Sequence, residues 1–316
     1  MLTALWSANY VCHLCRAHKR IRRLWWTQSG RGSRLRNTLC TNHQFLGWHL
    51  GQRVYSAFLL LIGFDIWRVW SDALHTLDLG IYQYAVPSAL WELTRDQRLW
   101  PGSTRASRLL LAYRDYKVWC SQHGVSEPVK KFEKKSFKKE KSKLIVWTQK
   151  TAKGAQMKHI VFWLAELCNR QNTNAHESVR ASLFNSFVMF ECACASQGRF
   201  CCPEAAEQIA VATEAALDCY NYLACQAGLS GIWHMVPKFH MYSHMGYDFA
   251  KKANPRRVQC YSDEDLIGKV KRILERCHGA TADKKGLLRY MFWVCLRWWI
   301  LLHRLRNVPV DVPRAP

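Results

Sequence analysis

Residues 234–278 read HMVPKFHMYSHMGYDFAKKANPRRVQCYSDEDLIGKVKRILERCH, and helix signals, paired histidines and an acidic cluster occur together in this stretch. Pro237 suits the first turn of a helix. His240 and His244 are four positions apart, so both imidazoles should lie on one face of that helix. This spacing is typical of metal ligands, but either ring could also form hydrogen bonds inside a core.

The second half of the stretch predicts another helix. Pro255 breaks the chain, and Ser262 with Asp265 forms a capping box. Apolar residues then recur at helical spacing as far as Cys277. The acidic first turn includes Glu264, and carboxylates at such positions complement the helix dipole without any catalytic role. Neither the histidine pair nor the acidic turn specifies a function by itself.

The order of these motifs resembles the end of the catalytic domain in CACTA/Mirage/Chapaev-type DDE transposases, which have a ribonuclease H-like fold. In that group, a His-x-x-x-His pair precedes a catalytic glutamate in a Glu-x-x-x-Gly-x-x-Lys-like helix. The resemblance implies that His240 and His244 form the pair. It also implies that Glu264 is the catalytic acid and that Gly268 is the glycine of the motif.

A second, upstream segment carries the same resemblance. DALHTLDLGI, residues 72–81, resembles the group's Asp-x-x-His-x-x-x-Leu-Gly segment, with Asp72 and His75 in the matching places. The resemblance implies that these two residues stand with the later histidine pair rather than acting in catalysis. Taken without the resemblance, the same residues indicate a capping aspartate and a packed histidine. The matched motifs are short, and the residues between them are only loosely similar.

The catalytic mechanism of that group needs acids that this chain lacks. DDE transposases hold two divalent metals, Mg or Mn, with three carboxylates, and two of these lie on strands that precede a Cys-x-x-Cys segment. Here eleven residues precede Cys12, and the first acidic residue is Asp65. The resemblance therefore implies the C-terminal part of a transposase that does not cleave or join DNA alone. Mg or Mn would bind only if the missing acids were supplied.

Composition points to a polyanionic partner. The chain of 316 residues has 46 Lys or Arg against 23 Asp or Glu, a net charge of +23. DNA in the nucleus is the expected partner, rather than an anionic membrane surface, and a solvated basic face is the alternative. No stretch predicts a membrane span. The sequence contains no Gly-rich phosphate-binding loop, so a small-molecule substrate is not expected. Fourteen cysteines without a secretory signal favour a reducing compartment.

Cysteine and histidine spacing near the N-terminus predicts a zinc site. Cys12 and Cys15 form one x-x-spaced pair, and Cys40 with His43 forms another. Three thiolates and one imidazole would complete a tetrahedral zinc site. Chance pairs also arise easily in a chain with 14 Cys and 13 His. The transposases named above also carry a Cys-x-x-Cys before the Asp-x-x-His segment, so the resemblance implies zinc as well.

Two basic stretches are the expected contacts with DNA. Residues 20–37 interleave arginines with Trp25 and Trp26, which could stack on bases or pack beneath the knuckle. Residues 130–143 contain eight lysines around Phe132 and Phe137, and the alternative there is a solvated face. The residues expected to contact DNA are Arg22, Arg23, Arg31, Arg34, Arg36, Lys130, Lys131, Lys134, Lys135, Lys138 and Lys139.

The rest of the chain indicates helices. Between residues 81 and 230, successive segments place apolar residues three and four apart, and none alternates as a strand would. After residue 280 we expect a long aromatic helix whose Trp293, Trp298 and Trp299 pack against the preceding helix. The sequence therefore predicts a mainly α fold.

Three regions follow from these patterns. We expect a basic zinc-knuckle-like segment over residues 1–55, an all-α insertion over 56–232, and a C-terminal helical region over 233–316. The last region would be the end of an incomplete ribonuclease H-like catalytic domain. Two functions remain open. One is a transposase-derived DNA-binding protein that is catalytically incomplete, and the other is a zinc-stabilised basic module for nucleic-acid binding or assembly, including self-association.

Overall fold

The computed structural model describes a chain that divides into two units, Met1–Gln259 and Cys260–Pro316. The sequence patterns place boundaries after residues 55 and 232 instead. Residues 233–259 belong to the first unit because they pack against helices that precede them in the chain. The residues described by the structure are 11–22, 25–50, 57–95, 97–126, 128–137, 144–228, 230–277 and 281–306.

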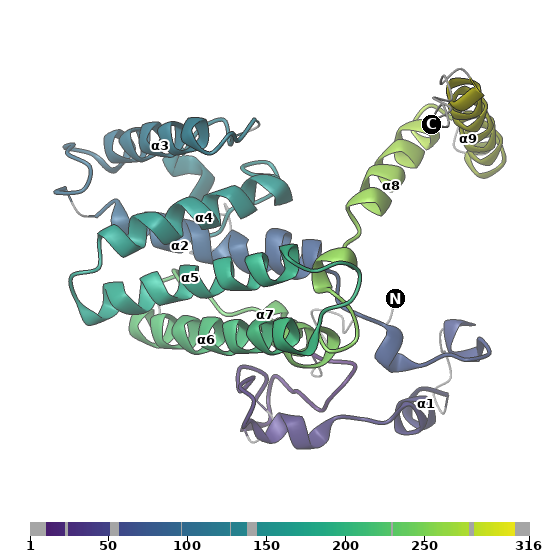
Figure 1. The fold of residues 1–316 in the computed structure, drawn as a ribbon, viewed down its shortest axis with the longest axis horizontal. Helices are drawn as coiled ribbons and strands as arrows, with labels where there is room; N and C mark the ends of the chain where they lie inside the picture. Colours follow the sequence, from purple (N-terminus) through teal and green to yellow (C-terminus); the bar gives the residue numbers. More distant parts are fainter. Residues whose placement is uncertain are drawn as a thin grey trace, which may run out of the picture. The chain divides into compact units, whose positions relative to one another are not determined.

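Helices form the core of the first unit, and no strand occurs among the residues described (Figure 1). The mainly α prediction is therefore confirmed. α5 (Ala175–Ala195) lies between α4 (Gly154–Arg170) and α6 (Pro203–Ala227) and packs along both. α2 (Tyr82–Leu93) continues from the π-helix η5 (Leu74–Ile81) and packs on α4.

Local sequence signals explain where these helices begin. α3 (Arg105–Gln122) starts after Thr104, which forms a capping box with Ser107. The side chain of Asn174 accepts a hydrogen bond from a backbone N–H in the first turn of α5. Pro203 occupies the first position of α6, where its missing N–H is not needed. Each start satisfies backbone donors that the helix itself leaves free.

The helix that carries both histidines is α7 (Lys238–His244), and it follows Pro237 as the sequence predicts. It continues into a π-helix, η7 (Met245–Phe249), and packs against α6 and η5. The approach of η5 is close, because a Cβ atom on Gly80 would collide with the side chain of Lys238. A glycine at this position therefore lets the 72–81 segment lie directly on the start of α7.

Shorter elements complete the first unit. α1 spans Asn42–Leu50. The 3-10 helices are η2 (Arg34–Thr38), η3 (Ala57–Leu60), η4 (Ile66–Arg68), η6 (Lys134–Phe137) and η8 (Pro255–Arg257). They lie in the segments that connect the longer helices.

A buried ion cluster joins four of these elements. Arg256 of η8 donates two hydrogen bonds to Asp78 of η5, with N–O distances of 2.8 and 3.0 Å. It also contacts both carboxylate oxygens of Glu191 on α5. Glu191 further accepts a hydrogen bond from Tyr82 and pairs with Lys158 of α4. Asp78 and Glu191 are almost fully buried, so their charges are compensated only inside the protein.

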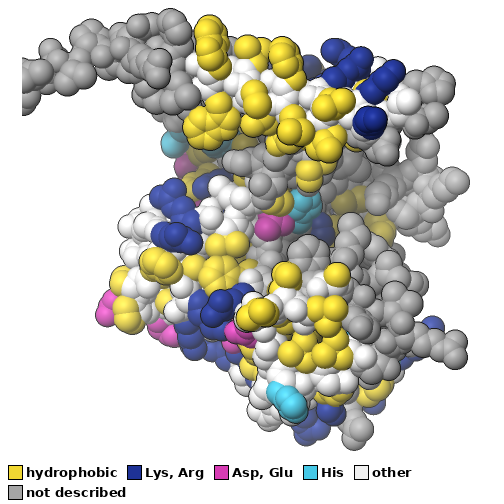
Figure 2. All heavy atoms as spheres, turned by 90° about the vertical axis from the view of Figure 1, so that its right-hand side faces the viewer, with side chains coloured by type: hydrophobic (Ala, Val, Ile, Leu, Met, Phe, Trp, Pro, Cys, Tyr) yellow, Lys and Arg dark blue, Asp and Glu magenta, His cyan; other side chains and the backbone are white. Residues whose placement is uncertain are grey.

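The second unit contains α8 (Tyr261–Leu274) and α9 (Ala282–Arg306), which pack against each other. α8 begins one residue before Ser262, so Cys260 takes the cap position predicted for Ser262. Trp293 faces α8 through a cation–π contact with Lys269. Trp298 and Trp299 expose 60% and 62% of their surface, so most of each side chain faces away from the packed interior of this unit. Hydrophobic side chains are visible along α9 at the top of Figure 2.

A membrane-spanning helix was not expected from the sequence. Within the part of the chain that the structure describes, no helix combines the length and the apolar character needed to cross a bilayer.

Candidate metal centre

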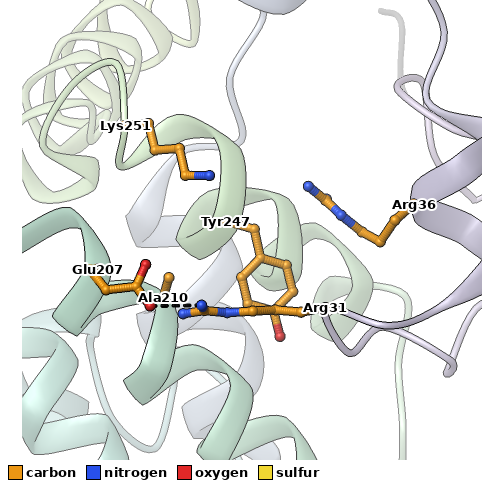
Figure 3. A pocket seen from close by; sticks show the side chains of 6 residues that line it. All are labelled: Arg31, Arg36, Glu207, Ala210, Tyr247 and Lys251. Atoms are coloured by element: carbon orange, nitrogen blue, oxygen red, sulfur yellow. Dashed lines mark hydrogen bonds and ion pairs between the residues drawn. The ribbon is translucent and has the colours of Figure 1, made fainter. Parts of the chain in front are cut away.

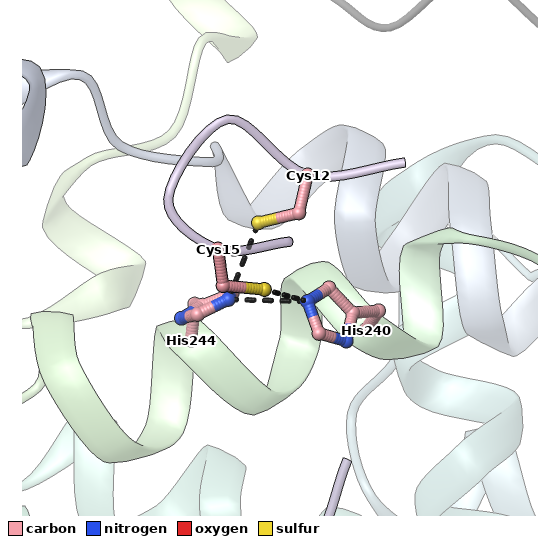
Figure 4. Close-up of side chains that lie close together, drawn as sticks. All are labelled: Cys12, Cys15, His240 and His244. Carbon is pink, nitrogen blue, oxygen red and sulfur yellow. Dashed lines mark hydrogen bonds between the residues drawn. The ribbon is translucent and has the colours of Figure 1, made fainter. Parts of the chain in front are cut away.

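Four potential metal ligands meet inside the first unit (Figure 4). They are Cys12 and Cys15 from the N-terminal loop and His240 and His244 from α7, and all four are buried. Their ligand atoms all lie within 4.8 Å of one another. The Sγ of Cys12 is 3.3 Å from Nε2 of His244, and the Sγ of Cys15 is 3.1 Å from Nε2 of His240. The two Nε2 atoms are 3.2 Å apart.

Local structure positions each half of this group. The histidines are one helical turn apart on α7, which places their rings side by side. The two cysteines lie in a tight loop in which the backbone N–H of Leu14 donates to the Sγ of Cys12 at 3.2 Å. A backbone hydrogen bond from Val11 to Ala17, 3.0 Å long, closes the loop. The loop therefore presents both sulfur atoms to the histidine face.

The donor set fits a metal ion such as zinc. Two thiolates and two imidazoles are a common tetrahedral ligand set for zinc, and four protein ligands leave no open position for substrate. Without a cation, the two Nε2 atoms and the two sulfur atoms form hydrogen bonds with one another in this buried space, whereas a cation could accept a lone pair from each of the four. The chemistry of the four residues thus supports a structural rather than a catalytic metal site.

Electrostatics inside the group are strongly coupled. A hydrogen bond from Cys12 lowers the pKa of Cys15, and further hydrogen bonds with the two histidines lower it too. Burial raises the pKa of Cys12 well above its ordinary value. Burial also lowers the pKa of His240, which keeps that ring neutral and able to act as a ligand. A bound cation would stabilise both sulfur atoms as thiolates and so remove the difference between the cysteines.

A carboxylate forms a hydrogen bond with one of the two histidines of the cluster. The Nδ1 of His244 lies 2.8 Å from Oδ2 of Asp248, one turn further along the chain. Arg36 donates two hydrogen bonds to the same carboxylate, at 2.7 and 2.6 Å. Burial alone would raise the pKa of Asp248, but the bonds with Arg36 and His244 hold it well below its ordinary value. A carboxylate in this position fixes the histidine tautomer so that Nε2 faces the metal.

We therefore expect Asp248→Asn to weaken zinc binding by about 10- to 100-fold, because such supporting carboxylates contribute that much to metal affinity. Competition with a chromophoric chelator measures the change. Asp218→Asn is the matched control, since Asp218 is an exposed residue of α6. Equal zinc affinities for the two variants would contradict the supporting role.

The ligand set predicted from the N-terminal spacing needs a correction. Cys40 and His43 are not part of the cluster, and the histidine pair takes their places beside Cys12 and Cys15. Cys40 is buried, and its thiol donates to the backbone oxygen of His13 at 3.6 Å. His43 is exposed in the first turn of α1. Cys40 thus acts as a packed apolar residue that holds the loop next to α7.

The other motif residues of the resemblance lie outside the cluster. Asp72 and His75 form an ion pair with each other, 2.8 Å long, and Asp72 accepts backbone hydrogen bonds at the start of η5. The carboxylate that contacts His244 is Asp248, a residue that sequence patterns did not single out. Its position four residues after His244 is the signal that could have revealed it.

Glu264 and Gly268 belong to the second unit. Both lie in α8, Glu264 in its first turn as the sequence predicts. The side chain of Glu264 falls outside the described residues. A Cβ atom added to Gly268 would meet open space, so local packing does not require a glycine there.

Two of the arginines predicted to contact DNA are bound by acids of the first unit (Figure 3). Arg31 pairs with Glu207 at 2.7 Å and with Glu214 of α6 at 3.3 Å. Arg36 is held by Asp248 as described above. The two guanidinium groups lie over the ring of Tyr247, at 5.7 and 5.4 Å from its centroid. They line a cavity of about 190 Å³, where acidic side chains compensate part of their charge.

The remaining predicted DNA contacts are exposed where the structure describes them. Trp26 is buried in the hydrophobic core, while Trp25 is partly exposed. The exposed cations are Arg22, Arg34, Lys130, Lys131, Lys134 and Lys135. Arg23, Lys138 and Lys139 lie outside the described residues.

Comparisons of this chain with protein-family models, with curated proteins and with solved structures found no match. The resemblance to DDE transposases therefore rests on the short motifs quoted above alone.

Proposed function

We propose that this chain is a zinc-stabilised DNA-binding protein of transposase descent, related to the C-terminal part of CACTA/Mirage/Chapaev-type enzymes. The buried group of Cys12, Cys15, His240 and His244 is the observation that carries the proposal. The Cys-x-x-Cys and His-x-x-x-His motifs are more than 220 residues apart, and the resemblance involves both. Their convergence on one donor set is what a shared zinc site of such a family requires.

The role of zinc in this proposal is structural. The N-terminal loop has little regular structure of its own, and it contacts α7 through its two cysteines. A zinc ion bound by all four residues would tie the loop to the helical core, and its binding free energy would add to the stability of the fold. The site would thereby fix the basic segment 16–38 next to η7, where Arg36 meets Asp248.

DNA binding is supported by charge. The net charge of +23 exceeds what solubility requires, and several lysines and arginines predicted to contact phosphate are exposed. Such contacts release condensed counterions from the duplex, so affinity is sequence-independent and falls with salt. A nuclear location follows from this partner.

We expect the zinc-loaded protein to bind a 30-base-pair duplex with an affinity that falls about 1000-fold or more between 50 and 200 mM salt, as six to ten phosphate contacts would produce. Fluorescence anisotropy with two duplexes of unrelated sequence provides the measurement, and both should bind equally well. A salt-independent affinity, or no binding at 50 mM salt, would contradict the proposed function.

The alternative is a zinc-stabilised assembly module that makes no use of transposase ancestry. The exposed hydrophobic side chains of α9, such as Phe292, Trp298 and Trp299, favour it. Genomic DNA upstream of Met1 distinguishes the two. An open frame with two strand-borne aspartates, between inverted repeats, supports transposase descent, whereas their absence together with concentration-dependent sedimentation supports the assembly module.

A further inference from the structure

Positive charge is concentrated on one side of the first unit. Residues 101–158 contain 15 Lys or Arg and 4 Asp or Glu, so nearly half of the net charge comes from 58 residues. By contrast, α6 has four acidic residues and no Lys or Arg. Figure 1 shows α3 and α6 on opposite sides of the layer formed by α4 and α5, in agreement with their packing. A polyanion is therefore attracted to the α3 side and repelled by α6.

Aromatic side chains hold the lysine-rich segment 128–137 against α3. Phe132 packs on Tyr113 and Tyr116 of α3, with ring centroids 5.4 and 5.5 Å apart. Phe137 packs edge-on against Trp147 at 5.2 Å. Both phenylalanines are buried, so the lysines between them are left on the outer surface. This anchoring gives the segment a defined place beside α3, unlike a free basic tail.

The cations of this side are accessible. Lys131 and Lys135 both pair with Glu133, yet their side chains remain 61% and 79% exposed, and surface pairs of this kind are weak. On α3, Arg114 and Lys117 are exposed one turn apart. Lys117 lies one helical turn after Tyr113, the residue on which Phe132 packs. The exposed cations of α3, of segment 128–137 and of the turn before α4 are Arg114, Lys117, Lys130, Lys131, Lys134, Lys135, Lys150 and Lys153.

The same surface exposes no large aromatic ring. No Phe, Tyr or Trp is exposed in its described residues, 101–126, 128–137 and 144–158, so unpaired bases would find little aromatic surface on which to stack. Most of its cations are lysines, which act as point charges on phosphate. With 18 residues, α3 is about 27 Å long, which matches about eight base-pair steps of 3.4 Å. These features favour the backbone of a duplex over a single strand.

We propose that α3 and segment 128–137 form one surface that binds the phosphate backbone of duplex DNA without reading its sequence. The inference rests on the proposed DNA-binding function and names the part of the chain that performs it. Arg31 and Arg36 of the basic segment 20–37 are paired with acidic residues, so we expect them to contribute less than the exposed cations of α3 and segment 128–137.

Two charge-reversal variants of the full-length, zinc-loaded chain test the surface. Both change four exposed cations to glutamate, so their net charges are equal. The surface variant combines Arg114→Glu, Lys117→Glu, Lys130→Glu and Lys134→Glu. The control variant combines Arg199→Glu, Lys252→Glu, Arg257→Glu and Arg272→Glu, four exposed cations that were not predicted to contact DNA. Circular dichroism and zinc content should match the wild type in both, because exposed substitutions of this kind change stability little.

We expect the surface variant to lose at least about 100-fold in affinity for a 30-base-pair duplex at 100 mM salt. Its plot of log affinity against log salt should be shallower by about 3.6, because four phosphate contacts contribute about 0.9 each. The control variant should change several-fold at most. Weaker binding of an oligo(dT) of 30 nucleotides than of the duplex is also expected.

Three outcomes have different meanings. Equal losses in the two variants would overturn the α3 surface while leaving DNA binding intact. Tighter binding of oligo(dT) than of the duplex, lost in the surface variant, would overturn the duplex assignment. No binding by the wild type would overturn the proposed function itself, and with it this surface.

Discussion

Cys15→Ser should abolish zinc binding and separate the N-terminal loop from α7. Purified wild-type protein is expected to carry about one zinc per chain, and the variant to carry almost none, because Cys15 contributes one of four ligands in a closed site. Binding of structural zinc is worth about 10–16 kcal/mol in small domains. The loss should therefore expose the loop to protease and lower the melting temperature, while the helices of α4, α5 and α6 persist. Elemental analysis, limited proteolysis and circular dichroism measure the three effects.

Cys40→Ser is the decisive control for this result. Cys40 is as buried as Cys15, lies in the same segment and was predicted as a ligand from its spacing to His43, but it is outside the cluster. Zinc content should stay at one per chain in Cys40→Ser and fall in His240→Ala. The reverse pattern would show that the N-terminal spacing, rather than the tertiary cluster, gives the ligand set. If wild-type protein prepared without chelators contained no zinc, both the ligand set from the N-terminal spacing and the tertiary cluster would be contradicted.

Arg256→Ala should destabilise the first unit by about 3–5 kcal/mol, the usual cost of breaking a buried ion pair from one side. The change leaves the carboxylates of Asp78 and Glu191 buried without the guanidinium that bridges them. Lys158 and Tyr82 still contact Glu191, but Asp78 loses two hydrogen bonds. Urea denaturation at neutral pH, followed by circular dichroism, gives the free energy of unfolding.

The neighbouring Arg257 provides the matched control. It has the same charge in the same 3-10 helix but is exposed, so Arg257→Ala should change the free energy of unfolding by less than about 0.5 kcal/mol. Adding Asp78→Asn to Arg256→Ala should restore part of the stability, because the uncompensated buried charge of Asp78 is then removed while Glu191 keeps its pair with Lys158. Equal destabilisation by the two arginine variants would show that the cluster contributes little.

Local patterns determined the secondary structure of this protein. They also determined each pair of potential ligands that lies within one short segment. Apolar spacing predicted helices, and Pro237 marked the start of α7. The i, i+4 spacing placed His240 and His244 on one face, because helix geometry depends only on neighbouring residues. The lysine run and its two phenylalanines were also evident from the sequence, whereas the burial of Phe132 and Phe137 was seen only in the structure.

Tertiary structure decided which partners these local pieces meet. Spacing joined Cys12 and Cys15 to Cys40 and His43, whereas packing of the loop on α7 brings them to His240, more than 220 residues away. Folding likewise pairs Arg36 with Asp248, a partner that the sequence did not indicate. Contacts at such separations depend on how whole helices pack, and sequence spacing carries no information about that distance. The sequence by itself therefore determined the helices and the chemistry of the donors, and only the fold determined which four donors come together.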